Sequence, residues 1–234
     1  MLVRSFSGGG SVIERFVERG DLWEYFGMEV EIFFDIEKEI ERVADTLKRL
    51  PWYREQGYTS FHTNLPKQLT EQSNRAEIAS AISAEFNEEK YRDYSEHIQK
   101  VWSEISQNLI KLKEIADFKL LQKYTIILTK YGSGGSYNSK QGVVIVNINF
   151  RSKEQIAGTI THEIIHIGIQ HLVDQYKIKH WYKERLVDLI CHHYFSDLRK
   201  MQDIKEDVSV VDKALEAYFP DIEAITKEIW EISI

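Results

Sequence analysis

Apolar residues recur at three- and four-residue steps through the first part of the chain. The clearest run consists of Phe33, Ile36, Ile40, Val43 and Leu47. Residues at these steps lie on one face of an α-helix, so the pattern predicts a helix from about 11 to 50. Pro51 is expected to end this helix, because proline lacks an amide proton and its ring clashes with the preceding turn. The charged segment from about 74 to 112 is predicted to be helical again, with its charges in solvent.

The character of the sequence changes near residue 120. β-branched and aromatic residues dominate 123–131 and 142–150, a composition typical of β-strands. The segment between them is rich in glycine and predicts a long turn. The two strands are therefore expected to pair with each other as a β-hairpin.

A long helix is predicted after the second strand. It is expected to begin after Ser152, whose spacing to Gln155 is that of a capping box, and to end near 173. Two further helical stretches are predicted at about 181–201 and 208–230, the second of them interrupted near Pro220.

This order of elements predicts an α+β, mostly helical protein. A helical N-terminal region, 1–119, is expected to precede a C-terminal domain, 120–234, which holds the small sheet and the long helix. The chain has 234 residues, enough for one large domain or two small ones.

Composition narrows the classes of function. The formal net charge is −7, which argues against general nucleic-acid binding, because phosphate contacts need surplus Lys and Arg. The single cysteine, Cys191, excludes an intrachain disulfide and is interpreted as a packed apolar residue. The sequence shows no signal-peptide pattern and no apolar run long enough for a membrane span. A cytoplasmic location without membrane association is the expectation.

The candidate catalytic and metal-binding residues lie in the predicted long helix, in the sequence THEIIHIGIQHLV. His162 and His166 are four residues apart and therefore share one helix face, where both imidazoles can bind one zinc ion at about 2.0–2.1 Å. Glu163 lies about 100° further round the helix, beside such a metal, where it can accept a proton from metal-bound water. The alternative is that these are polar residues of a buried helix, which is costly unless partners satisfy them.

The stretch His162-Glu163-Ile164-Ile165-His166 resembles the signature of zincin metallopeptidases. The third metal ligand distinguishes the branches of that family. Metzincins carry a glycine three positions after the second histidine and a histidine six positions after it. Gly168 and His171 come one position too early, and His171 would point about 180° away from His162 on a continuous helix.

The following helix is similar to that of the gluzincin, thermolysin-like branch, in its minimal form. Glu184 and Asp188 are four residues apart there. The resemblance implies that Glu184 is the third zinc ligand and that Asp188 binds the far nitrogen of a ligand histidine, fixing its tautomer. It covers about 123–196, and Lys183 stands where thermolysin has an asparagine. The domain at 120–234 would then be a zincin-like metallopeptidase domain.

His180 offers an alternative third ligand. In SprT-like zincins, which act near DNA, a third histidine follows the motif at a comparable distance. Those proteins usually carry a glycine next, whereas Trp181 follows here, and they tend to be basic, whereas this chain is acidic. If His180 is not a ligand, it is a candidate donor to the oxyanion formed during hydrolysis.

The resemblance also implies where a substrate would bind. Zincins place an edge strand above the metal, and the substrate backbone pairs with it. The segment 143–150 is expected to be that strand, with Asn147 as a contact for substrate amides or as an ordinary edge-strand residue. Tyr137 is a further candidate oxyanion donor.

The expected activity is zinc-dependent hydrolysis of a peptide or protein substrate, with Glu163 as general base. Two alternatives stay open. One is a latent or inactive zinc-binding regulatory protein, in which the helical N-terminal region blocks the cleft. The other is a SprT-like protease associated with DNA.

Overall fold

The computed structural model describes residues 27–58, 64–195 and 201–233. The strands are β1 (Glu29–Phe33), β2 (Lys123–Thr129), β3 (Gly135–Asn138) and β4 (Val143–Asn147). The helices are α3 (Ile36–Glu55), α5 (Arg75–Glu85), α6 (Glu88–Ile115), α7 (Lys153–Tyr176), α8 (His180–Tyr194), α9 (Ser209–Tyr218) and α10 (Ile222–Ser233). The predicted α+β, mostly helical class is confirmed.

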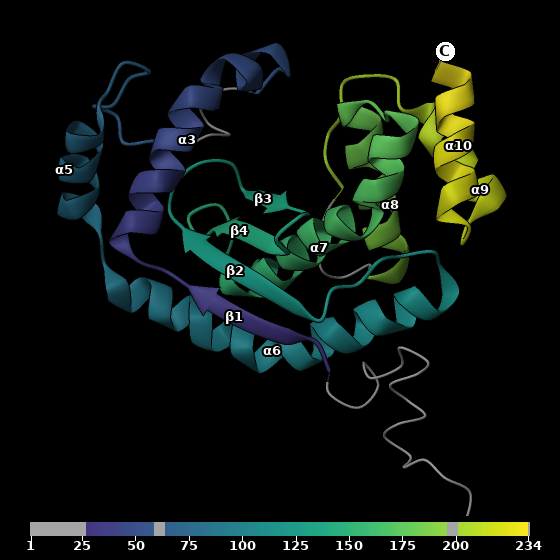
Figure 1. Ribbon diagram of the computed structural model, residues 1–234, viewed down its shortest axis with the longest axis horizontal. Coiled ribbons are helices and arrows are strands. Elements are labelled where there is room, and N and C mark those ends of the chain that lie inside the picture. The colour runs from purple at the N-terminus through teal and green to yellow at the C-terminus, as the bar shows by residue number, and fades with distance from the viewer. Residues whose placement is uncertain (1–26, 59–63, 196–200, 234) are drawn as a thin grey trace, which may run out of the picture.

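The sheet has the order β1-β2-β4-β3 (Figure 1). β2 pairs in parallel with β1 and with β4, whereas β3 runs antiparallel to β4. The predicted hairpin of two adjacent strands is therefore wrong. The glycine-rich segment forms the edge strand β3, and left-handed backbone at Gly132 and Gly142 permits the reversals on either side of it.

The start of the first predicted helix is also different. Residues 29–33 form β1, in which polar and apolar residues alternate and only the alternate positions are partly buried. Helix α3 begins after Asp35, whose side chain accepts a hydrogen bond from the backbone N–H of Lys38 at 2.7 Å. Pro51 does not end the helix, which continues to Glu55. The part of the predicted helix before residue 27 lies outside the described residues.

Helices α6 and α7 pack against each other and against the sheet (Figure 1). α6 contacts β1 and β2, and α7 contacts β3 and β4. Alternate buried residues of the strands, such as Ile126 and Val144, join the apolar faces of both helices in one core. Strand β1 and helix α6 come from the N-terminal region, so the sheet and the core extend across the expected division between 119 and 120.

Helix α7 runs through the centre of the molecule and positions the HEIIH motif. At its start the Gln155 side chain accepts a hydrogen bond from the Ser152 backbone N–H at 3.3 Å, as the capping pattern predicted. Gly168 lies against the ring of Phe118, and a Cβ at this position would lie 2.1 Å from that ring. Close packing therefore accounts for the glycine that partly matches the metzincin pattern.

The C-terminal helices complete the surroundings of α7. α8 packs against α7 and against α9, and α10 packs against α9 and α7. The predicted interruption of the last helical stretch is confirmed, since Pro220 lies between α9 and α10. α8 ends at Tyr194, earlier than predicted, and residues 196–200 lie outside the described part of the chain.

Candidate metal centre and the cavity around it

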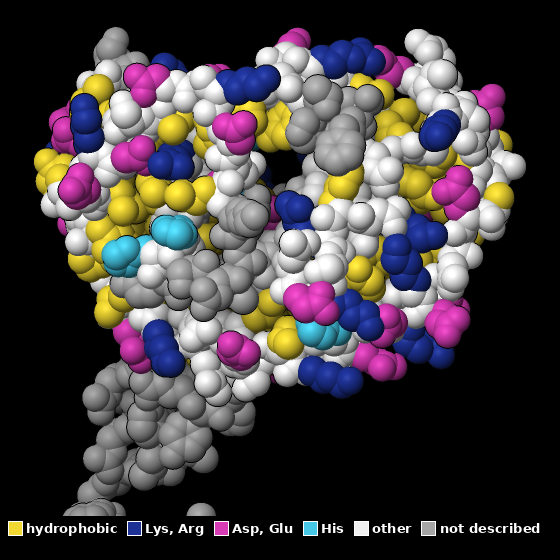
Figure 2. Space-filling view, turned by 180° about the vertical axis from the view of Figure 1, so that it is seen from behind, with side chains coloured by type: hydrophobic (Ala, Val, Ile, Leu, Met, Phe, Trp, Pro, Cys, Tyr) yellow, Lys and Arg dark blue, Asp and Glu magenta, His cyan; other side chains and the backbone are white. Residues whose placement is uncertain are grey.

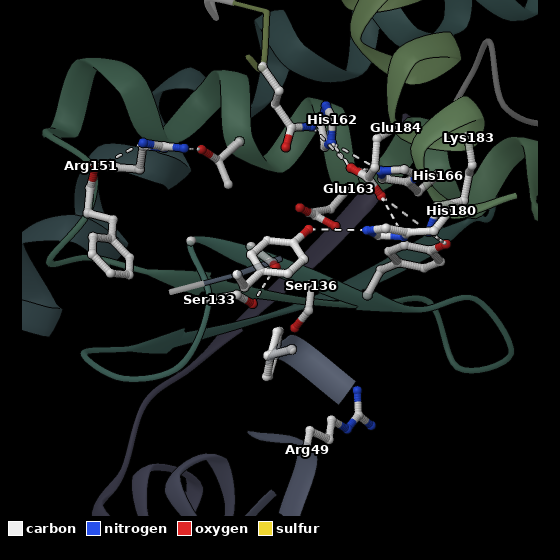
Figure 3. A pocket seen from close by; sticks show the side chains of 18 of the residues that line it. Arg49, Ser133, Ser136, Arg151, His162, Glu163, His166, His180, Lys183 and Glu184 are labelled. Carbon is white, nitrogen blue, oxygen red and sulfur yellow. Dashed lines mark hydrogen bonds and ion pairs between the residues drawn. The ribbon is translucent and has the colours of Figure 1, made fainter. Parts of the chain in front are cut away.

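Three potential metal ligands from α7 and α8 meet in the interior (Figure 3). The Nε2 atoms of His162 and His166 are 3.0 Å apart. The Oε2 atom of Glu184 lies 3.5 Å from the first and 3.4 Å from the second. Ligands that hold one zinc ion tetrahedrally at about 2.0–2.2 Å are about 3.3–3.6 Å apart. The three atoms thus already surround a space of nearly the size that such an ion occupies.

The environment favours the protonation states that a metal requires. Burial lowers the pKa of His166 to about 3, so its imidazole is neutral at pH 7. Burial acts to raise the pKa of Glu184, but the two imidazoles and the Lys183 ammonium outweigh it and hold that pKa well below its usual value. A neutral imidazole and an ionised carboxylate are the forms that bind metal ions.

Asp188 supports the group from behind. Its Oδ1 atom lies 3.2 Å from the Nδ1 atom of His162, the nitrogen that faces away from Glu184. Its Oδ2 atom accepts a hydrogen bond from the Gln202 backbone N–H at 2.6 Å. A carboxylate there keeps the proton of His162 on Nδ1, which leaves Nε2 as the donor atom for a metal.

Replacing Asp188 by alanine is expected to weaken zinc binding by roughly 10–100-fold, because His162 loses the partner that fixes its tautomer. Competition against a chelator of known affinity measures the change. Asp174→Ala is the matched control, since Asp174 lies in α7 itself but is exposed and accepts a hydrogen bond from Gln170 rather than contacting the candidate ligands. Equal zinc affinity in Asp188→Ala and the wild type would contradict a role for Asp188.

Glu163 lies beside the ligand group without belonging to it. It is only 5% exposed and lines a cavity that lies in front of these residues. The backbone of β3 passes so close that a Cβ at Gly135 would lie 2.2 Å from the Oε1 atom of Glu163. Gly135 therefore allows the edge strand to approach the carboxylate, and a side chain there would displace it.

The cavity in front of these residues has a volume of about 340 Å³. Its walls come from the ligand group, from the segment 133–137 that includes most of β3, and from α3 with the residues that follow it. Figure 3 shows Ser133 and Ser136 on the sheet side, with Arg49 approaching from α3. Figure 2, which shows the molecule from behind, has a dark hollow in its upper middle.

His180 lines the cavity but is not one of the ligands that meet. Its Nδ1 atom is 3.8 Å from the Oε1 atom of Glu184, and its Nε2 atom is 3.2 Å from the hydroxyl oxygen of Tyr58. Burial lowers the pKa of His180. His180 therefore lies in the cavity wall between Glu184 and Tyr58.

Tyr137 also lies in the cavity wall. Its ring stacks on His166, with 4.9 Å between ring centroids. Its hydroxyl donates a hydrogen bond to Gln170 at 2.6 Å and lies 3.3 Å from the Nζ atom of Lys183. Tyr137 therefore holds the orientation of the His166 ring while its hydroxyl is engaged with other side chains.

Asn147 does not have the position expected of a substrate contact. It is fully buried in β4, which lies between β2 and β3 rather than at the edge. Its Nδ2 atom donates to the Gly132 carbonyl at 3.0 Å, and its Oδ1 atom accepts from the Asn149 backbone N–H at 2.9 Å. The side chain fixes the loop before β3. The prediction that 143–150 contains the edge strand is wrong, because β3 forms that edge of the sheet.

The sequence reasoning missed the contribution of the N-terminal region to this cavity. Arg49, Trp52, Tyr53 and Tyr58 line it, although no motif marks them. The first three stand at helix spacing on one face of α3. The helix spacing is visible in the sequence, but no sequence pattern indicates that this face of α3 lines the cavity.

Comparison of the chain with protein-family models, with curated proteins and with solved structures finds no significant match. Any functional assignment therefore depends on the residues of the site itself. None of the helices in the described ranges combines the length and apolar character needed to cross a bilayer.

Proposed function

We propose that the protein is a zinc-dependent peptidase of the gluzincin type. The observation that carries this proposal is the buried meeting of His162, His166 and Glu184, whose ligand atoms all lie within 4.8 Å of one another. A further carboxylate, Glu163, stands beside them in the cavity wall. Two imidazoles, one carboxylate and a separate base are the residues that zinc-assisted hydrolysis requires.

When bound, zinc lowers the pKa of a coordinated water molecule and polarises a carbonyl group. The residues of the chain supply the remaining chemistry. Glu163 accepts a proton from the attacking water and passes it to the leaving amine. Asp188 holds His162 in the ligand tautomer. His180, which lines the cavity and whose Nε2 atom lies 3.2 Å from the Tyr58 hydroxyl oxygen, is the candidate donor to negative charge that develops on the substrate oxygen.

Strand β3 is the proposed binding edge for the substrate backbone. Within the described residues β3 has a partner strand only on the β4 side. Gly134, Gly135 and Ser136 line the cavity next to Glu163. An extended peptide that pairs with β3 as an added strand would pass in front of the ligand group.

The geometry favours this proposal over the two alternatives. The described residues of the N-terminal region, 27–58 and 64–119, form a wall of the cavity and leave about 340 Å³ open in front of Glu163. In a SprT-like centre His180 would be the third ligand. Here the residue whose potential ligand atom lies close to those of the paired histidines is Glu184. On the face shown in Figure 2, basic and acidic side chains are interspersed rather than gathered into a basic patch.

The test is metal-dependent proteolysis by the full chain. Purified protein is expected to contain about one zinc per chain by elemental analysis and to cleave an unfolded protein substrate. Removal of the zinc with a chelator is expected to abolish cleavage, and restoring one equivalent should recover it. Stoichiometric zinc without cleavage of any unfolded protein or peptide library would instead indicate a regulatory zinc protein.

A further inference from the structure

We propose that Arg49 binds a carboxylate of the peptide substrate and so gives the cavity a preference for acidic peptides. This inference rests on the proposed peptidase function, because it names the substrate class of that same site.

Arg49 lies on the wall that α3 contributes to the cavity, apart from the candidate ligands His162, His166 and Glu184 (Figure 3). It shares one face of α3 with Trp52 and Tyr53, and all three line the cavity. Figure 3 shows its side chain extending from α3, separate from the cluster around Glu184. A group bound by Arg49 would therefore belong to a part of the substrate away from the reacting carbonyl.

The other charged side chains of the cavity already have roles. Lys183 and Glu184 form an ion pair, with 3.2 Å between Nζ and Oε1. Glu163 is the proposed base. Arg151 donates to the Thr159 hydroxyl at 3.2 Å and to the Phe150 carbonyl at 3.2 Å. Arg49 lines the cavity without a hydrogen bond or ion pair to any residue in the described ranges.

A second arginine on the same face adds to this positive charge. Arg42 precedes Arg49 by two helical turns and is buried. It donates to the Tyr131 carbonyl at 3.4 Å and to the Ser133 hydroxyl at 3.1 Å, both neutral acceptors. Burial lowers the pKa of Arg42, and the charge of Arg49 acts in the same direction. Arg42 itself does not line the cavity, and within the described residues no carboxylate is hydrogen-bonded to either guanidinium group.

A carboxylate is the anion that this arrangement suits within a peptide. A guanidinium group presents parallel N–H donors that match both oxygens of a carboxylate. Trp52, which is 42% exposed, supplies apolar surface beside it for the methylene groups of an acidic side chain. The carboxylate can come from an Asp or Glu side chain or from the C-terminus of the peptide, and the experiment separates these sources.

The first experiment maps cleavage sites by mass spectrometry after digestion of an unfolded protein mixture. The wild type is expected to show Asp and Glu enriched about five- to tenfold at one fixed position relative to the cleaved bond. In Arg49→Glu this enrichment should vanish, while cleavage elsewhere continues. Lys48→Glu is the control, because it makes the same charge change at the next residue, which does not line the cavity. Enrichment that persists in Arg49→Glu overturns the proposal.

The second experiment measures binding without catalysis. Zinc-loaded protein is titrated with dye-labelled hexapeptide pools that carry one Glu or one Gln at varied positions, with the C-terminus amidated. A third pool carries Gln and a free C-terminus. Tighter binding of the Glu pool, lost in Arg49→Glu and kept in Lys48→Glu, supports a side-chain carboxylate. The same pattern for the third pool indicates the C-terminal carboxylate.

These readouts separate the two proposals. If the wild type cleaves nothing but binds acidic pools through Arg49, the peptidase proposal fails and the anion site stands. If the wild type cleaves peptides without acidic enrichment and binds all pools equally, the peptidase proposal stands and the role of Arg49 is refuted.

Discussion

Replacement of Glu163 by glutamine is expected to reduce peptide hydrolysis by roughly 10²–10⁴-fold while leaving zinc content unchanged. Glutamine has nearly the same shape but cannot accept the proton of the attacking water. Glu163 is not one of the residues whose ligand atoms meet, so the metal should remain bound. Glu163 is 5% exposed and lies against the backbone of Gly135, so a glutamine of the same shape should occupy the same position.

The measurement compares initial rates on one quenched fluorescent peptide with the zinc content of the same samples. Glu154→Gln is the matched control, since Glu154 lies in the first turn of the same helix and is exposed. That variant should keep the wild-type rate. A Glu163→Gln protein that hydrolyses the peptide at the wild-type rate would exclude Glu163 as the general base.

Local sequence patterns predicted the elements that carry the candidate centre. The capping residues Ser152 and Gln155 and the spacing of His162 and His166 are properties of a single helix, which the 3.6-residue period makes readable. The i, i+4 spacing of Glu184 and Asp188 is readable for the same reason. The spacing within each helix does not show that the two helices meet, because tertiary packing decides which helix faces come together. That part of the prediction came from the resemblance to gluzincins.

The sheet was predicted less well because its pairing is not local. β2 and β4 are each recognisable as strands, but their composition does not show that they pair in parallel with a third strand beside them. β3 contains glycine and serine and was interpreted as part of a turn. β1 is only five residues long, and its alternation was overlooked next to a strong helical pattern. The prediction that Asn147 lies on an edge strand is wrong for the same reason, since its exposure depends on which strand forms the edge.

The cavity wall contributed by α3 could not be predicted from the sequence. Arg49 and Tyr58 are more than 100 positions upstream of the histidines, and no short motif links them. Their position follows from β1, which pairs with β2 and thereby fixes the start of α3 beside the sheet. The N-terminal region is therefore part of the candidate site, and the full chain is the proper material for every test of function.

Replacement of Glu184 by glutamine is expected to lower zinc affinity by at least about 100-fold, because one of the proposed metal ligands loses its charge and most of its donor strength. It should also destabilise the metal-free protein. Lys183 lies 3.2 Å from Glu184, and the two side chains are only 16% and 11% exposed. Burial acts to lower the pKa of Lys183, and the charge of Glu184 is the main influence that outweighs it. Without that charge the ammonium is left nearly buried, at a cost of roughly 2–4 kcal/mol.

A double variant separates the two effects. Lys183→Met combined with Glu184→Gln removes the stranded ammonium together with its partner, and should regain most of the stability lost in the single variant. It should not regain zinc affinity, because the carboxylate ligand is still absent. Urea unfolding of the metal-free proteins and chelator competition for zinc provide the two measurements. If Glu184→Gln binds zinc as tightly as the wild type, Glu184 is not a ligand, and the pairing with Lys183 is its main role in the structure.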